Sequence, residues 1–111
     1  MEIKKEIRKE SYAVKVTAEE NGEILGRAYL YVIFNDLRDQ PYGLLEDVFV
    51  AEHARKHGLG TKLVQAIVAE AKERKLGRLI CTSRYARPEV HAWYIQLGFK
   101  DYGKEFKMDL N

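Results

Sequence analysis

The first half of the chain alternates between apolar and polar positions in the manner of β-strands. Residues 12–16 (YAVKV) alternate in this way, and residues 24–34 (ILGRAYLYVIF) are rich in aromatic and β-branched types. The dipeptide Asn21-Gly22 between them is typical of a tight hairpin turn. These segments predict an antiparallel β-hairpin, followed by a proline-containing loop at 35–42.

A third strand is predicted at 44–50 (LLEDVFV). Successive side chains of a strand point to opposite faces, so Asp47 and Phe49 are expected to share a face with Leu45, and Glu46 to lie on the other. The strand is therefore expected to carry two carboxylates among apolar residues, one on each face.

The second half of the chain predicts two helices. Apolar residues recur at helical spacing over 59–75, and Gly77 is expected to end that helix. Residues 1–10 fit an edge strand or a helix, and we favour the strand. The remaining predicted elements are a strand at 78–82, a helix from Pro88 to about Leu97 closed by Gly98, and strands at 99–102 and 104–110.

Together these elements predict an α/β (α+β) fold in the order β-β-β-α-β-α-β-β. The central sheet is expected to be mixed and mostly antiparallel, with two main helices. The length of 111 residues, with 46% hydrophobic and 32% charged residues, favours a single globular domain over 1–111.

Charge and cysteine content exclude several classes of protein. A formal net charge of +2 is far from the basic excess of a dedicated nucleic-acid binder. The single cysteine, Cys81, excludes an internal disulfide and is expected to pack rather than to react, and we expect no metal site. No apolar run is long enough for a signal peptide or a bilayer span, so we expect a soluble cytoplasmic protein with no membrane partner.

The most informative stretch is Arg55-Lys56-His57-Gly58-Leu59-Gly60-Thr61-Lys62, between a strand and the start of a long helix. Glycines let the backbone approach a ligand, and the first amides of a helix point at whatever lies above them. Residues 53–69 contain three Lys or Arg, two His and no Asp or Glu. The stretch therefore predicts an anion site, with phosphate as the natural ligand.

The two glycines do not fit the common nucleotide-binding motifs. A Walker A loop needs Gly-Lys-Ser/Thr after a four-residue spacer, and a dinucleotide fingerprint needs a third glycine where Leu63 stands; both fail. Taken alone, Gly58 and Gly60 are more often parts of a tight turn surrounded by solvated charges.

A second block of sequence favours a ligand-binding turn over a merely structural one. Arg55-x-x-Gly58-x-Gly60, preceded by the strand 45–50, resembles the acetyl-coenzyme A signature of the GNAT superfamily of N-acetyltransferases. Residues 87–99 (RPEVHAWYIQLGF) resemble the later helix of that family, which carries an aromatic-Tyr pair and ends in Gly-Phe. The resemblance covers about 43–102 strongly and 12–34 at the level of strand order.

The resemblance implies acetyl-coenzyme A as the cosubstrate. The strand before the turn would splay from its neighbour at a bulge, and its backbone would hold the acetyl group and the pantetheine arm. The implied coenzyme contacts are Val48, Phe49 and Val50 on the strand, Arg55, Lys56, His57, Gly58, Leu59, Gly60 and Thr61 around the pyrophosphate, and Arg87, which stands where many relatives have Asn.

The resemblance also implies direct acetyl transfer to a primary amine. Alkylammonium groups are protonated at neutral pH, so a base is needed; Glu46 stands where many relatives place that base. Tyr94 matches the tyrosine that would protonate the departing thiolate, whereas Trp93 is expected to pack and His91 to be exposed or to cap the helix.

The acceptor is left open by the sequence. Family members usually have one or two helices before the position of the 12–16 strand, so the acceptor side is expected to be unusually open, and a second subunit in a homodimer could fill it. Asp36 and Asp39 could attract a cationic small-molecule or peptide amine. A coenzyme-binding module without transfer activity is the alternative function, and a nucleic-acid-binding protein is disfavoured by the charge.

Overall fold

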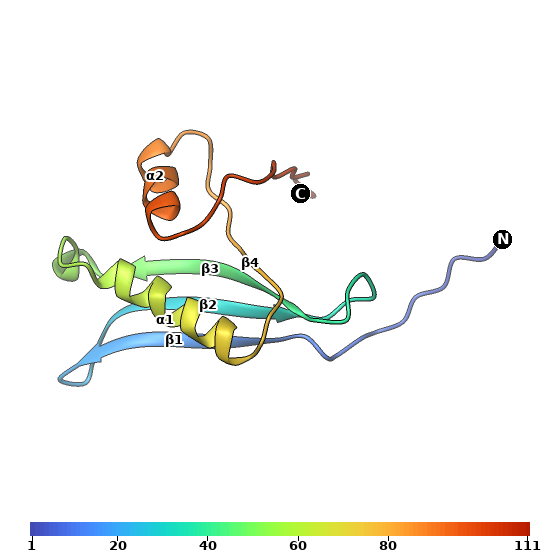
Figure 1. Cartoon of the computed structure of the whole chain (residues 1–111), viewed down its shortest axis with the longest axis horizontal. Helices are drawn as coiled ribbons and strands as arrows, with labels where there is room; N and C mark the ends of the chain where they lie inside the picture. Colours follow the sequence, from blue (N-terminus) through green and yellow to red (C-terminus); the bar gives the residue numbers. More distant parts are fainter. The chain divides into compact units, whose positions relative to one another are not determined.

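The computed structural model describes the whole chain, residues 1–111, as two units that divide after Cys81 (Figure 1). The first unit, Met1–Cys81, contains a sheet and one long helix, and the second, Thr82–Asn111, contains one helix. The prediction of a single domain over 1–111 stays a prediction. The elements are β1 (Tyr12–Glu20), β2 (Glu23–Ile33), β3 (Tyr42–Val50), the 3₁₀ turn η1 (Glu52–Ala54), α1 (Leu59–Glu73), β4 (Leu79–Ile80) and α2 (Pro88–Gln96).

Strands β1 and β2 form the predicted hairpin. Asn21 and Gly22 both have positive φ, 52° and 79°, which a type I′ turn requires at its two central residues. Glu20 faces Glu23 beside the turn, and Tyr12 faces Val32 at the far end. The hairpin predicted at Asn21-Gly22 is confirmed.

The sheet has the order β1-β2-β3-β4, with antiparallel pairs except for the parallel pair of β3 and β4. Helix α1 covers one face of the first three strands. The mixed, mostly antiparallel sheet with two helices is confirmed. Two apolar sets form the core, Ala28, Leu30, Val32 and Leu45 on the strands and Leu63, Val64, Ile67 and Ala71 on α1.

A bulge in β3 corrects the predicted faces of that strand. Tyr29 faces Glu46 but Arg27 faces Phe49, so β3 contains one residue more than β2 between these pairs. Asp47 has a φ of 55° at this point. The alternation therefore shifts, and Phe49 lies on the face of Glu46 rather than on the buried face of Leu45.

Strand β3 separates from β4 after a short contact. The two strands pair only at Gly43 with Leu79 and Leu44 with Ile80, and the Gly43 N–H donates to the Arg78 carbonyl at 2.9 Å. No strand pairs with this edge of β3 beyond Leu44. The backbone from Leu45 to Val50 thus has one unpaired edge.

Helix α1 is terminated by a different residue from the one predicted. Lys75, not Gly77, adopts the left-handed conformation, with a φ of 59°. The N–H groups of Lys75 and Leu76 donate to the carbonyls of Lys72 and Ala71, the two hydrogen bonds of a Schellman motif. Gly77 instead donates to the Pro41 carbonyl at 3.0 Å, so its role is close packing against a loop.

The predicted strands at both ends of the chain are wrong. Residues 1–11 and 99–111 contain neither strand nor helix, and no strand of the structure pairs with them. Alternating apolar side chains such as Phe106 and Met108 are exposed instead, because a strand forms only where a partner accepts its hydrogen bonds.

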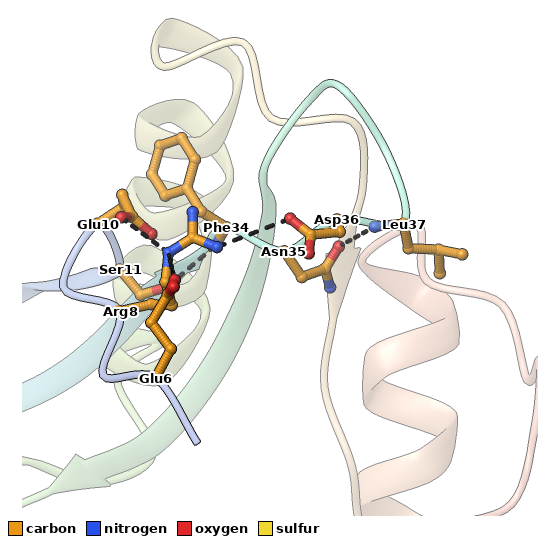
Figure 2. Close-up of polar contacts among 8 residues, drawn as sticks. All are labelled: Glu6, Arg8, Glu10, Ser11, Phe34, Asn35, Asp36 and Leu37. Atoms are coloured by element: carbon orange, nitrogen blue, oxygen red, sulfur yellow. Dashed lines mark hydrogen bonds and ion pairs between the residues drawn. The ribbon is translucent and has the colours of Figure 1, made fainter. Parts of the chain in front are cut away.

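The end of the N-terminal segment is held by polar contacts (Figure 2). The Phe34 N–H donates to Ser11 Oγ at 3.0 Å, and Arg8 lies between carboxylates of its own segment and Asp36.

No helix in the structure combines the length and the apolar character needed to cross a bilayer.

We predict that Gly26→Ala destabilises the first unit. A Cβ at this position would lie 2.8 Å from the Phe49 carbonyl oxygen and 2.9 Å from Leu63 Cδ1, where α1 approaches the sheet. The free energy of unfolding should fall by about 1–3 kcal/mol in urea denaturation followed by circular dichroism. Gly103→Ala, with open space around its Cβ, is the matched control; an unchanged Gly26→Ala midpoint would contradict the tight packing.

Candidate active site

The turn before α1 has the backbone of an anion site. Lys56 and Gly58 have positive φ values of 68° and 77°, and a Cβ on Gly58 would meet nothing within 4 Å. The N–H of Lys62 donates to the Gly58 carbonyl at 3.1 Å as the first bond of the helix. The amides of Leu59 and Gly60 precede it, so the turn presents backbone donors to open space.

The charge around this turn is favourable to an anion. Gly58, the N-cap, has no side chain to cap the helix, and the first turn of α1 contains no acidic residue. Lys56, His57 and Lys62 are exposed beside it. The positive end of the helix dipole is therefore reinforced by side chains rather than neutralised.

Arg55 joins the turn to the end of β3. Its Nε donates to the Val50 carbonyl at 2.9 Å, and its guanidinium lies 6.0 Å from the centre of the Phe49 ring. Ala51 donates its N–H to the Leu25 carbonyl at 2.8 Å, which anchors the strand end to β2. These contacts fix the position of the turn relative to Val48, Phe49 and Val50, which lie on the unpaired edge.

The two carboxylates of β3 lie in different electrostatic environments. Asp47 accepts two hydrogen bonds from Arg27, Oδ2 from Nε at 2.9 Å and Oδ1 from Nη2 at 3.0 Å. The hydrogen bond from Arg27 lowers the pKa of Asp47. Glu46 is exposed and makes no hydrogen bond or ion pair. Asp47 is therefore held by Arg27, which lies on the face of Glu46.

Tyr94 and Arg87 belong to the second unit. Tyr94 packs between Trp93 and Phe99, with ring centroids 5.1 and 5.5 Å away, and its carbonyl accepts from the Phe99 N–H beyond the end of α2. Arg87 is the N-cap residue of α2, and its Nε lies 3.6 Å from Glu89 Oε1. The aromatic cluster orients the Tyr94 ring on its helix.

His91 is engaged within the same unit. Its Nε2 lies 2.7 Å from the Arg84 carbonyl oxygen. A carbonyl only accepts, so Nε2 carries the proton and donates it. This contact ties the loop before α2 to the helix and gives His91 a structural role.

Cys81 ends the first unit and is half-buried. Burial raises the pKa of its thiol to about 11. The thiol is therefore protonated at neutral pH, and a nucleophilic role is disfavoured.

Sequence reasoning missed the aromatic residues that share the sheet face of Glu46. Tyr29 and Tyr31 stack with their centroids 5.7 Å apart, and the Arg27 guanidinium lies 4.7 Å from the centre of the Phe49 ring. The signal was present in β2, where Arg27, Tyr29 and Tyr31 alternate with residues that are apolar and now found to be buried. Pairing the two strands in register would have placed them on the face of Glu46.

Comparison with known proteins places this geometry in a family. The model of the acetyltransferase (GNAT) family matches residues 2–99. The chain therefore belongs to the GNAT acetyltransferase family.

Individual proteins share part of the sequence or the fold of this chain. The chain is 30% identical over 89 residues to the uncharacterized N-acetyltransferase YhfO of Bacillus subtilis, covering 80% of this chain and 60% of that protein. A structure from Agrobacterium tumefaciens assigned as an acetyltransferase has a TM-score of 0.82 at 26% identity, covering 88% of this chain and 69% of the other. A transcriptional regulator from Bacillus halodurans has a TM-score of 0.81 at 27% identity, with coverages of 88% and 66%.

We predict that the Arg27–Asp47 pair stabilises the fold in a pH-dependent manner. Because the folded pKa of Asp47 is lowered, its contribution is complete above the ordinary aspartate pKa of about 3.9 and is lost as the pH falls through the folded value. Asp47→Asn should therefore lower the melting temperature at pH 7, with a difference from wild type that narrows below about pH 4.

Asn tolerates the left-handed backbone of position 47, so this variant removes the charge without adding strain. Asp36→Asn, at a carboxylate with 95% side-chain exposure and a cation no nearer than 3.9 Å, is the control and should change little. If the melting temperatures of Asp47→Asn and wild type differed by the same amount at every pH, the ion pair would not be the source of the stability.

Proposed function

We propose that the protein is an acetyl-coenzyme A dependent N-acetyltransferase acting on a primary amine. The family supports acetyl transfer in general. The observation that carries the finer proposal is the continuity of three features along β3: an unpaired carboxylate at Glu46, an unpaired backbone edge to Val50, and an uncapped helix start at Gly58.

The residues of the turn fit a pyrophosphate. Open space above Gly58, backbone amides ahead of the first helical bond and the absence of acids all favour a bound polyanion. In this proposal Leu59, Gly60 and Thr61 hold phosphate through the helix start, and the β3 edge at Val48–Val50 binds the arm. Acetyl-coenzyme A, when bound, supplies the acetyl group.

Protein side chains handle the protons of the reaction. Glu46 accepts a proton from the ammonium form of the acceptor, directly or through water, because the neutral amine is the nucleophile. Tyr94 supplies a proton to the thiolate that leaves. Arg87 contacts the coenzyme arm or its phosphates in place of the usual asparagine.

Gly60→Asp should weaken binding of acetyl-coenzyme A. A carboxylate in the first turn repels phosphate, and the affinity measured by isothermal titration calorimetry should fall about tenfold or more. An acid at this position is favourable to the helix itself, so the loss would report on the ligand rather than on folding.

Ala69→Asp is the matched control, since it makes the same charge change at an exposed position of α1 about 14 Å further along the axis. Equal affinities of wild type and Gly60→Asp would remove the proposed phosphate site.

Glu46→Gln should reduce transfer while leaving coenzyme affinity unchanged. Loss of a general base costs about 10²–10⁴ in rate, and thiol release from acetyl-coenzyme A in the presence of an amine acceptor measures it. Activity of Glu46→Gln equal to wild type would exclude Glu46 as the base. A wild-type protein that binds the coenzyme but releases no thiol with alkyl monoamines, polyamines, amino acids, aminoglycosides or peptides would favour the alternative, a binding module without transfer.

A further inference from the structure

The sheet face opposite α1 carries Glu46 within an ordered array of side chains. Residues that face one another on neighbouring strands share a face of the sheet. The registers of the two antiparallel pairs give a row of Ala13, Tyr31 and Leu44, and beside it a row of Lys15, Tyr29 and Glu46. Ala13 has the smallest side chain of the first row, so the row leaves space above β1, and this space is called the gap at Ala13.

A pocket of about 400 Å³ occupies this position in the first unit. Its volume lies toward the lower end of the roughly 300–1,000 Å³ typical of small-molecule sites. The lining residues are Ser11, Tyr12, Ala13, Tyr31, Val32, Ile33, Leu44 and Glu46. The pocket is therefore mostly apolar, with Glu46 as the one charged residue in its lining.

Charge selects among the kinds of amine that this pocket could accept. A phosphorylated amine needs a cation in the pocket, and no Lys, Arg or His lines it. A polyamine or an aminoglycoside needs several acceptors for its ammonium groups, and Glu46 is the one carboxylate. Asp47 is occupied by Arg27, so it adds no free charge to the same face.

Polar contacts hold the chain in place around Ser11, which lines one part of the pocket. The Phe34 N–H donates to Ser11 Oγ, and Arg8 lies 3.3 Å from Glu10 and 3.9 Å from Asp36 (Figure 2). Asp36 does not line the pocket, which leaves Glu46 as the anchor for an incoming ammonium group.

We propose that the acceptor is a small primary monoamine with an apolar alkyl or aryl body. Its ammonium group lies at Glu46, and its body lies over Leu44 and Tyr31 toward the gap at Ala13. This inference rests on the proposed function, since it takes Glu46 as the base, and it adds the substrate class.

A series of amines tests the proposal on the full chain. Propylamine, butylamine, pentylamine and hexylamine are titrated by ¹H–¹⁵N NMR, with spermidine and glucosamine 6-phosphate as the polycationic and phosphorylated comparisons. The dissociation constant should fall about two- to fourfold per added methylene group, because each one leaves water for an apolar wall. Spermidine and glucosamine 6-phosphate should bind more weakly than hexylamine.

Two variants locate the effect. Ala13→Phe fills the gap and should flatten the dependence on chain length, so that hexylamine loses its advantage over propylamine. Ile24→Ala, an exposed apolar residue on β2 outside the pocket, is the control and should retain the dependence. Melting temperatures verify that both variants are folded.

The outcomes separate this inference from the proposed function. Affinity that does not depend on chain length, or tighter binding of spermidine than of hexylamine, overturns the monoamine assignment, even if thiol release from acetyl-coenzyme A shows transfer to some amine. A chain-length dependence that Ala13→Phe removes supports the assignment. If that dependence is found but no amine promotes thiol release, the pocket remains a monoamine site and the transferase proposal falls.

Discussion

The bulge at Asp47 is the constraint on which the rest of the site depends. One residue inserted into β3 opposite β2 turns Phe49 onto the face of Glu46 and leaves Val50 in place to accept the Arg55 hydrogen bond. The left-handed backbone of Asp47 is unfavourable by itself, and two hydrogen bonds from Arg27 hold it in place. A salt bridge on the surface thus lies at the bulge, before the strand enters the turn that precedes α1.

Periodic patterns predicted the parts of the fold that local sequence controls. The hairpin follows from Asn21-Gly22, and α1 and α2 follow from apolar spacing, Pro88 and Gly98. The resemblance implied a bulge in the strand before the turn, but its position at Asp47 could not be predicted from the local sequence. An inserted residue leaves no local signature and yet moves every later side chain of the strand. The left-handed conformation of Lys75, which ends α1, could not be predicted either. Glycine adopts this conformation more easily than lysine, so Gly77 was the expected end of the helix.

The predicted site was partly accessible from sequence. The turn around Gly58 was found from its glycines and charges, and Glu46 from the resemblance, whereas the tyrosines of β2 needed the register of two strands. The strands predicted at 99–102 and 104–110 show the opposite limit: the alternation of Phe106, Met108 and Leu110 is present, but a pattern cannot supply the strand that it must pair with.

The uncapped start of α1 has a thermodynamic consequence. A helix whose N-cap carries no side-chain acceptor lacks a contribution of typically about 1 kcal/mol that serine, threonine or aspartate would provide. Under the proposed function, an anion bound at Gly58 would take over that role and satisfy the same amides. Binding of the ligand and stability of the helix would then be linked, so a saturating ligand would make local unfolding of the first turns of α1 less frequent. The ligand would thereby supply the stability that the helix start lacks.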